Sequence, residues 1–491
     1  MRFYYWAAIL ILFSCDKPVK NDHPEKPNFL FLFADDLTFD GLNSLGNDEI
    51  KTPNLDALKR RGFTFTHAFN QGSWSGAVCV VSRAMLACGR YIYHARDDIN
   101  TAPLWGEVMG QSGYKTFMTG KWHNGHQTVY KSFQTAKSVG AGMYETKGGM
   151  QGPGYHRPVV GEEDFWSPYD TTLLGHWFPK FYDIVTTDTG KVTTPEYRVH
   201  RHTSEIYADN AIEFLNEQKG YVDQPFFMYV AFNAPHDPRQ APKEFLDMYP
   251  LDEVAVPDNY LPEHPFDQGE KMTLRDELLA PIPRTEYAVK KHRQEYYAII
   301  THLDQQIGRI LEALERNGQA NNTYIIFTAD HGLAVGKHGL LGKQNQYDHS
   351  IRVPMIIVGP DIPQDRTSDE LVYLQSAFPT TCELAGITPP SDVEFRSVLP
   401  IIKQGQSGET AIFGSYKDYQ RMVRTKEYKL ILYPEVHQNQ LFKLSDDPLE
   451  MHNAFDNSDN APIIQSLYKQ LTKLQEEVGD TLRITLPSEK I

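Results

Sequence analysis

Three aspartates in the sequence stand directly after short apolar runs, in positions where a metal ion would account for them. Asp35 and Asp36 follow the run 28–34, while Asp330 follows the run 324–329 and is itself followed by His331. A single Asp-Asp pair is more often a strand cap or a turn. Burying the whole set without a partner would be very costly, however, and an oxygen-rich set favours calcium or magnesium. We therefore predict a metal site, to which His331 could add a nitrogen ligand.

Cys79 is the second candidate for chemistry. The sequence after it suits a short helix stopped by Gly89, which would put Cys79 at a helix N-terminus, a natural anion site. Arg83, one turn further on, could offer a two-pronged fork to an oxyanion. A buried cysteine taken alone is usually an inert, small apolar residue. Cys79, Cys88 and Cys382 are the cysteines beyond the N-terminal leader, and three cannot all pair, so no disulfide framework is implied.

The elements that must position these residues are predicted to be strands of a largely parallel sheet. Near-continuous apolar runs of this kind are typical of buried parallel strands. Such runs occupy 28–34, 114–119, 225–232 and 324–329, each followed by polar groups, and 353–358, which has no acid or base at its end. Helical patterns, as at 52–62 and 295–316, lie between them and indicate an α/β fold. Functional groups in such sheets gather beyond the carboxyl ends of the strands, so four strands should deliver theirs to one edge.

The chain divides into three predicted parts: a leader, 1–27, a catalytic domain, 28–390, and a C-terminal α+β subdomain, 391–491. Four short β-like runs between 411 and 444 and a helix at 462–478 predict a smaller antiparallel sheet closed by a helix. Two long irregular segments, 139–170 and 250–284, could shape a substrate cleft. Further candidates for substrate contact are Trp74, His126, His156 and Arg157.

The N-terminus resembles an export signal. Arg2 precedes an apolar run, 3–13, that is too short to span a bilayer and is typical of a signal peptide. The run ends in a sequence similar to a bacterial lipobox, in which cleavage leaves Cys15 as a lipidated first residue; an ordinary signal peptide is the alternative. Residues 16–27 are polar, as a tether would be. We expect an outer-membrane or cell-surface lipoprotein, or else a periplasmic protein, held to the membrane only through its lipid.

The charge balance restricts the partners. A formal charge of -15 at pH 7 argues against a general nucleic-acid binder, which would show a basic face. It leaves room for an anionic substrate, because a local positive pocket can lie within an acidic protein.

The segment around Cys79 resembles a family signature. Cys79-Val80-Val81-Ser82-Arg83 with Gly89-Arg90-Tyr91 is similar to the C-x-P-S-R or C-x-A-S-R signature of type I, formylglycine-dependent sulfatases of the alkaline-phosphatase-like superfamily. Further matches follow in family order: Asp35-Asp36, Thr52 to Gly62, Gly120 to His123, Ala234-Pro235-His236, Asp330-His331-Gly332, His338-Gly339, Gly342-Lys343, Leu441 to Leu444 and Asp447 to Asn453. The resemblance spans about residues 27 to 480.

The resemblance implies an alkaline-phosphatase-like fold, one calcium ion per chain and oxidation of Cys79 to formylglycine, whose hydrate attacks sulfur. A formylglycine-generating or anaerobic sulfatase-maturating enzyme would be the partner for that step. The implied metal ligands are Asp35, Asp36, Asp330 and His331. The implied catalytic roles are orientation of the formylglycine by Arg83, binding of sulfate oxygens by Lys121 and Lys343, protonation of the leaving alcohol by His236, and removal of a proton from the remaining hydroxyl by His123. Bacterial polysaccharide sulfatases are the type implied, with a sulfated carbohydrate as substrate.

Three positions depart from the family pattern, and two other functions stay open. Val81 replaces the usual proline or alanine in the segment that the maturation enzyme reads, Cys88 replaces a common threonine, and His331 stands where some members have asparagine. One alternative is a phosphoester or phosphonate hydrolase of the same superfamily. The other is an unmodified surface lipoprotein that binds sulfated glycan without turnover. The sugar, the sulfate position, endo or exo action and the oligomeric state are not encoded in these motifs.

Overall fold

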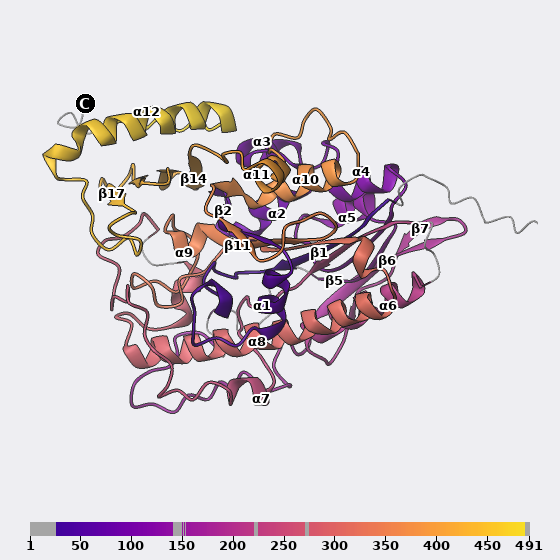
Figure 1. Cartoon of the computed structure of the whole chain (residues 1–491). Helices are drawn as coiled ribbons and strands as arrows, with labels where there is room; N and C mark the ends of the chain where they lie inside the picture. Colours follow the sequence, from indigo (N-terminus) through magenta and orange to yellow (C-terminus); the bar gives the residue numbers. More distant parts are fainter. Residues whose placement is uncertain are drawn as a thin grey trace, which may run out of the picture.

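The computed structural model describes residues 26–140, 150, 152, 154–219, 224–270 and 274–486. A 12-stranded sheet flanked by helices and a separate 5-stranded sheet make up a mixed α/β fold (Figure 1). The predicted fold class is confirmed. The predicted lipidation site, Cys15, lies outside the described residues.

Four adjacent parallel strands form the centre of the large sheet, in the order β10 (Thr323–Ala329), β1 (Asn28–Ala34), β9 (Phe226–Ala231) and β4 (Lys115–Lys121). These are the four strands that the apolar runs predicted. Ala34 is in register with Ala329, and Gly120 with Ala231. The strands therefore end at the same level, and the residues after them meet at one edge.

The flanks of the large sheet mix parallel and antiparallel strands. The fifth apolar run forms β11 (Arg352–Val358), which is antiparallel to β10. Its carboxyl end thus lies at the opposite edge, which explains why no acid or base follows it. The other strands are β2 (Phe63–Phe69), β5 (Thr135–Gly140), β6 (Lys180–Thr187), β7 (Gly190–Thr193), β8 (Tyr197–Arg198), β12 (Arg366–Ser368) and β13 (Val372–Tyr373).

Helices cover both faces of the large sheet (Figure 1). One face carries α1 (Pro53–Arg60), α6 (Thr203–Glu217), α7 (Lys243–Leu246) and α8 (Glu286–Arg316). The other carries α2 (Val78–Cys88), α3 (Ile92–Asp98), α4 (Trp105–Gln111), α5 (His126–Ser132), α10 (Ala377–Leu384) and α11 (Leu399–Gln404). Short elements are α9 (Asp348–Ile351) and the 3₁₀ turns η1 (Asn43–Leu45), η3 (Arg275–Leu279), η4 (Ala320–Asn322), η5 (Leu374–Ser376) and η6 (Ser458–Asn460).

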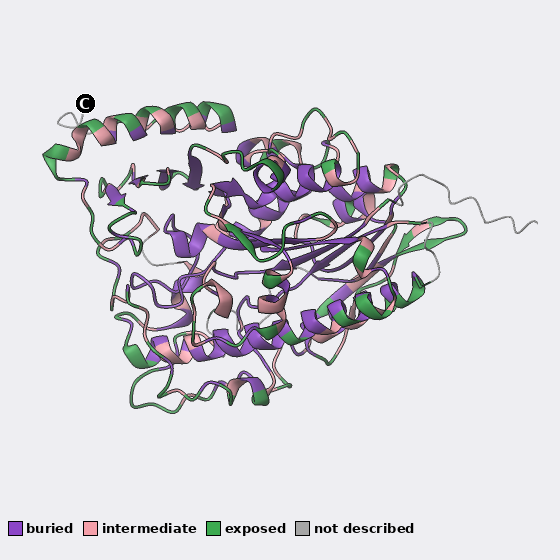
Figure 2. Ribbon diagram, viewed as in Figure 1, coloured by how far each residue is buried: buried purple, intermediate pink, exposed green. Residues whose placement is uncertain are grey.

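Helix α8 is longer than predicted. The helical spacing of apolar residues predicted a start at Glu295, whereas the helix begins at Glu286, where the Thr285 side chain accepts a hydrogen bond from the Ala288 amide. This N-cap satisfies one of the free amides of the first turn. In Figure 2 the side of α8 that faces the sheet is buried and the outer side is exposed, as expected for an amphipathic helix.

The smaller sheet has the strand order β17-β16-β15-β14-β3 and is covered by α12 (Ala461–Val478). Its C-terminal strands are β14 (Ile412–Tyr416), β15 (Gln420–Arg424), β16 (Tyr428–Leu432) and β17 (Gln440–Lys443), so the four predicted runs and the closing helix are confirmed. The added strand, β3 (Gly72–Ser73), pairs in parallel with β14 and stands six residues before Cys79. The smaller sheet is thus joined directly to the segment that carries the candidate nucleophile. The proposed division at residue 390 stays a prediction.

Among the helices of the described ranges, none combines the length and apolarity that crossing a bilayer would require.

Candidate active site

The side chains that the sequence singled out converge at the carboxyl edge of the central strands. Strand β1 leads to Asp35 and Asp36, β10 to Asp330 and His331, β9 to His236, and β4 to Lys121 and His123. Helix α2 contributes Cys79 and Arg83, and the loop after β10 contributes Lys343. All ten are buried or nearly so. The predicted convergence is therefore observed, and Cys79 lies at its centre.

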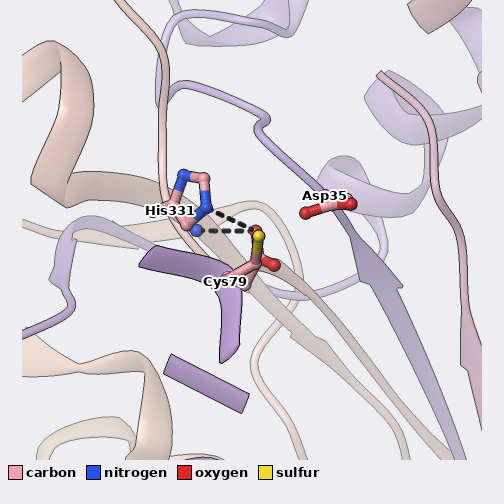
Figure 3. A group of neighbouring side chains, drawn as sticks. Asp35, Cys79 and His331 are labelled. Atoms are coloured by element: carbon pink, nitrogen blue, oxygen red, sulfur yellow. Dashed lines mark hydrogen bonds and ion pairs between the residues drawn. The ribbon is translucent and has the colours of Figure 1, made fainter. Parts of the chain in front are cut away.

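Two overlapping groups of these residues have the chemistry of a metal site. One ligand atom each from Asp35, Cys79, Asp330 and His331 lies within 4.8 Å of the others, and Asp36, Cys79 and His236 form a second such group. Figure 3 shows Asp35, Cys79 and His331 directed toward a common point from three separate segments.

The orientation of His331 suits a cation ligand. Its Nδ1 lies 2.9 Å from the Gly332 carbonyl oxygen, to which it can donate, so Nε2 faces the carboxylates. Nε2 lies 3.1 Å from Asp36 Oδ1 and 3.6 Å from Asp330 Oδ1. Among the described residues, neither His331 Nε2 nor Asp35 Oδ1 has a hydrogen-bond partner. Buried polar atoms normally have one, so a cation fits these donors.

The pKa shifts of Asp35 and His331 also indicate a cation site. Burial raises the pKa of Asp35, and the neighbouring Asp330 raises it further. Burial lowers the pKa of His331, but Asp330 and Asp36 outweigh it and bring that pKa to about 9. Since the carboxylates draw a proton onto this imidazole, the cluster favours additional positive charge. A hard divalent cation would supply it.

Three cations brace the carboxylates. Arg83 Nε donates to Asp330 Oδ2 at 2.9 Å, and Arg83 Nη1 donates to the Lys121 carbonyl oxygen at 2.8 Å. The Lys121 ammonium contacts Asp35, and Lys343 Nζ lies 2.8 Å from each oxygen of Asp36. Each candidate metal carboxylate therefore has its own cationic partner.

Cys79 differs from the other two described cysteines. It lies in the first turn of α2, as predicted, and Lys343 Nζ is 3.8 Å from its sulfur. Burial raises the pKa of the Cys79 thiol, but Lys121 and Lys343 oppose this and bring it well below its usual range. Burial raises the pKa values of Cys88 and Cys382 to about 12. Only Cys79 among these three is therefore electrostatically activated.

Two histidines, His123 and His236, interact with the Cys79 thiol and help to lower its pKa. His236 Nδ1 lies 2.6 Å from the Asp237 carbonyl oxygen, and its Nε2 lies 3.9 Å from Asp36 Oδ2. Burial and Lys343 lower the pKa of His236, yet nearby carboxylates, Asp36 foremost, leave it raised. Burial lowers the pKa of His123. The pKa of His236 is thus raised and that of His123 lowered, which suits His236 as an acid and His123 as a base.

A second layer of charged residues was missed by the sequence analysis. Arg275 Nη2 lies 3.0 Å from Asp237 Oδ1, and Arg275 also pairs with Asp276. Asp276 Oδ2 accepts a hydrogen bond from Gln344 Nε2 at 2.9 Å. In the sequence, the only sign of this layer was that Asp237 directly follows His236. Arg275 and Asp276 lie in a segment whose sequence pattern is that of an irregular loop, so nothing indicated that they approach the site.

The candidate substrate contacts have different environments. Arg157 is buried and bonded to Asp164 and Glu295, so it braces the fold around α8. His126 lines a cavity beside His123. His156 is exposed and Trp74 is half-buried against the core.

Comparison with known proteins identifies the family. The model of the sulfatase family matches residues 27–387, and the model of the C-terminal region of N-sulphoglucosamine sulphohydrolase matches residues 336–477. An arylsulfatase of Clostridium perfringens is 27% identical over 464 residues, covering 91% of this chain and 94% of its own. An N-acetylglucosamine-6-O-sulfatase of Bacteroides thetaiotaomicron is 25% identical over 562 residues, covering 98% and 91%.

A solved structure adds the evidence on the fold. It is that of a protein in complex with its substrate D-glucosamine-2-N,6-O-disulfate, with a TM-score of 0.72 and 21% identity, covering 93% of this chain and 99% of that one. At this identity the likeness establishes the fold alone, while the family model spans well over half of the chain. The chain therefore belongs to the sulfatase family of the alkaline-phosphatase-like superfamily, and it is a sulfuric ester hydrolase.

Proposed function

We propose that this protein hydrolyses sulfate esters of a carbohydrate, with formylglycine derived from Cys79 as nucleophile and one calcium ion as cofactor. The observation that carries the proposal is the position of Cys79, whose sulfur lies among the carboxylates of a candidate cation site, 3.8 Å from Lys343 and next to two histidines. The carbohydrate class is supported by the relative that is named an N-acetylglucosamine-6-O-sulfatase.

The calcium ligands would be Asp35, Asp36, Asp330 and His331. Three carboxylates and one imidazole form an oxygen-rich set that suits a hard cation. Asp35 Oδ1 and His331 Nε2 are buried atoms that make no hydrogen bond within the described part of the chain, which supports this assignment. When bound, the ion would neutralise the carboxylates and attract the oxygens of the sulfate group.

Formylglycine would arise by oxidation of the Cys79 β-carbon to an aldehyde with loss of the thiol sulfur, and a formylglycine-generating or anaerobic sulfatase-maturating enzyme would supply the oxidant. Its hydrate supplies the hydroxyl that attacks sulfur. Arg83 keeps Asp330 and the Lys121 backbone fixed beside this position, because its guanidinium bonds both. It acts as a positioning residue.

Binding and proton transfer would fall to residues whose geometry suits each task. Lys121 and Lys343 would hold the sulfate oxygens, since both ammonium groups face the centre of the site. The S–O bond to the sugar then breaks, and His236 would donate a proton to the departing alcohol. His123, whose pKa is lowered, would accept a proton from the remaining hydroxyl while the C–O bond to the sulfate group breaks, which releases sulfate and restores the aldehyde.

The test begins with co-expression of the chain and a formylglycine-generating enzyme. The peptide that contains residue 79 should lose about 18 Da, the change from thiol to aldehyde. Turnover of 4-nitrophenyl sulfate should require calcium and vanish in Cys79→Ala. Cys88→Ala is the matched control, because Cys88 is buried elsewhere on α2 and bonds Ala84.

Two outcomes would favour the alternative functions. Faster release from an aryl phosphonate monoester than from the aryl sulfate would point to a phosphonate hydrolase. An unmodified Cys79 without turnover would indicate that Val81 blocks maturation, and a glycan-binding role would then replace hydrolysis.

A further inference from the structure

The irregular segment 250–284 sends three consecutive charged side chains to the candidate active site. Arg275, Asp276 and Glu277 begin the short 3₁₀ turn η3. Asp276 and Glu277 are 1% and 3% exposed, so both carboxylates are removed from water. Burying a charged group is costly unless it is well bonded, so the partners of these three side chains indicate what the turn does.

The carboxylate of Glu277 holds the loop that carries Lys343. Its Oε1 accepts a hydrogen bond from the Gly342 amide at 2.7 Å, and its Oε2 accepts one from the Leu341 amide at 3.0 Å. Arg284 Nη2 donates to the same Oε2 at 2.7 Å, which keeps the carboxylate in place. Hydrogen bonds to a charged group are among the stronger ones in proteins, so the backbone just before Lys343 is firmly fixed.

The loop and η3 approach each other closely at Gly342. A β-carbon on this residue would lie 2.8 Å from Glu277 Oε1 and 2.9 Å from Asp276 Cβ, which is closer than such atoms pack. A larger residue at position 342 would therefore push the loop away from η3.

The carboxylate of Asp276 acts on the other side of Lys343. Its Oδ2 accepts a hydrogen bond from Gln344 Nε2 at 2.9 Å, and Gln344 Oε1 accepts one from the Lys343 amide at 3.1 Å. Gln344 Nε2 also donates to the Gly76 carbonyl oxygen at 3.2 Å, three residues before Cys79. Asp276 thus ties the Lys343 loop to the segment that leads to the candidate nucleophile.

The guanidinium of Arg275 holds a different part of the site. It forms two hydrogen bonds to the Asp237 carboxylate, one of them from Nη2 to Oδ1 at 3.0 Å. Asp237 directly follows His236, and its carbonyl oxygen accepts a hydrogen bond from His236 Nδ1 at 2.6 Å. Arg275 therefore fixes the residue that orients the His236 imidazole.

We propose that η3 is a positioning element of the active site. Asp276 and Glu277 fix the loop that presents the Lys343 ammonium, and Arg275 fixes the His236 imidazole through Asp237. This inference rests on the proposed function, in which Lys343 binds the sulfate group and His236 protonates the departing alcohol. One turn thereby sets the positions of both groups. Because a misplacement of about 1 Å can cost about 100-fold in rate, substitutions in η3 should slow turnover through the residues that it positions.

The first experiment is a double-mutant cycle on the matured protein with calcium. Glu277→Gln should lower kcat/KM for 4-nitrophenyl sulfate by about tenfold when Lys343 is present, and by less than about twofold in Lys343→Met, because the loop then has no ammonium to present. A merely structural loss would have the same size in both backgrounds. Gly342→Ala, which keeps every buried charge, should behave like Glu277→Gln. Glu315→Gln is the matched control, since Glu315 is an exposed glutamate that pairs with Arg61.

The second experiment tests Arg275 through the leaving group. Arg275→Gln should lower kcat/KM for an alkyl sulfate by about tenfold more than that for 4-nitrophenyl sulfate, since only the poor leaving group needs the proton from His236. Arg275→Lys keeps the charge but lacks the planar fork, so it should show the same preference to a smaller extent. Arg201→Gln is the matched control, since Arg201 is an exposed arginine that pairs with Glu205.

The results separate positioning from structural support. Thermal melts first establish that each variant is folded at the assay temperature. Equal effects of Glu277→Gln and Gly342→Ala with and without Lys343, or equal losses on both leaving groups in the Arg275 variants, would overturn the positioning role and leave the proposed function intact. A matured wild-type protein that releases sulfate from no ester would refute the proposed function, and this inference would fall with it.

Discussion

The ammonium group of Lys343 lies between the carboxylate of Asp36 and the sulfur of Cys79, 2.8 Å from both carboxylate oxygens and 3.8 Å from the sulfur. Lys121 makes the corresponding contact with Asp35. A cation bound by these aspartates would compete with the lysines for the same oxygens. Calcium binding would thereby make the two ammonium groups available to an incoming sulfate.

Replacing Lys343 by methionine should therefore separate metal binding from turnover. We expect calcium to bind about tenfold more tightly, a gain of about 1.4 kcal/mol, because Asp36 loses its competing cation. Turnover of 4-nitrophenyl sulfate should fall at least about 100-fold, since the positive charge that would hold the sulfate group is lost. Titration calorimetry on metal-free protein gives the affinity. Lys137→Met is the control, as Lys137 pairs with Glu213 outside the site; weaker calcium binding by Lys343→Met would disprove the competition.

Removal of calcium should destabilise the fold. Binding to the native state alone contributes about 2.7 kcal/mol at a ligand concentration 100 times Kd. We expect a chelator to lower Tm by about 3 °C, reversibly, in a thermal melt. The double variant Asp35→Asn, Asp330→Asn should abolish this shift in Tm. Asp304→Asn is the control and should retain the shift, because the buried Asp304 carboxylate lies away from the site and accepts a hydrogen bond from the Leu55 amide in α1. Identical melts with and without calcium would refute the metal site.

Much of the candidate site could be predicted because its residues stand at the ends of apolar strands. Asp35 and Asp330 are adjacent since β1 and β10 are parallel and in register, and a buried parallel strand leaves a clear apolar signature. The pairing of β3 with β14 could not be predicted, because a two-residue strand has no periodicity and its partner lies far away in the sequence.

Arg83 should be essential to the free energy of unfolding as well as to the position of the Asp330 carboxylate. Arg83→Leu would leave the Asp330 carboxylate and the Lys121 carbonyl oxygen without their buried donor, which typically costs about 3–5 kcal/mol. Urea unfolding with calcium present measures this loss. Arg83→Lys should recover part of it, because lysine keeps the charge but lacks the planar fork. Arg201→Leu, at an exposed ion pair, should cost less than about 1 kcal/mol, and a similarly small loss for Arg83→Leu would contradict the assignment.

His67 should make the protein less stable in acid. Burial, together with Arg352 and Arg424, lowers the pKa of His67 from 6.5 to about 3. Between these values the unfolded chain binds a proton that the folded chain does not, so the free energy of unfolding falls as pH falls from 6.5 toward 3. One such group contributes at most about 1.4 kcal/mol per pH unit. His67→Gln should flatten this slope in urea unfolding at a series of pH values; parallel curves for the two proteins would show that His67 does not contribute.

The two histidines that we propose as proton donor and proton acceptor should be distinguishable by the leaving group. If His236 protonates the departing alcohol, His236→Ala should reduce turnover of sugar and alkyl sulfates by about 10²–10⁴-fold, because these alcohols leave poorly without a proton. Turnover of 4-nitrophenyl sulfate, with a good leaving group, should fall much less. His123→Ala should instead slow all substrates by a similar factor, since in our proposal His123 would act on the remaining hydroxyl. Steady-state rates over a series of aryl and alkyl sulfates test both roles. A uniform loss in His236→Ala would show that His236 binds the sulfate group and does not deliver the proton.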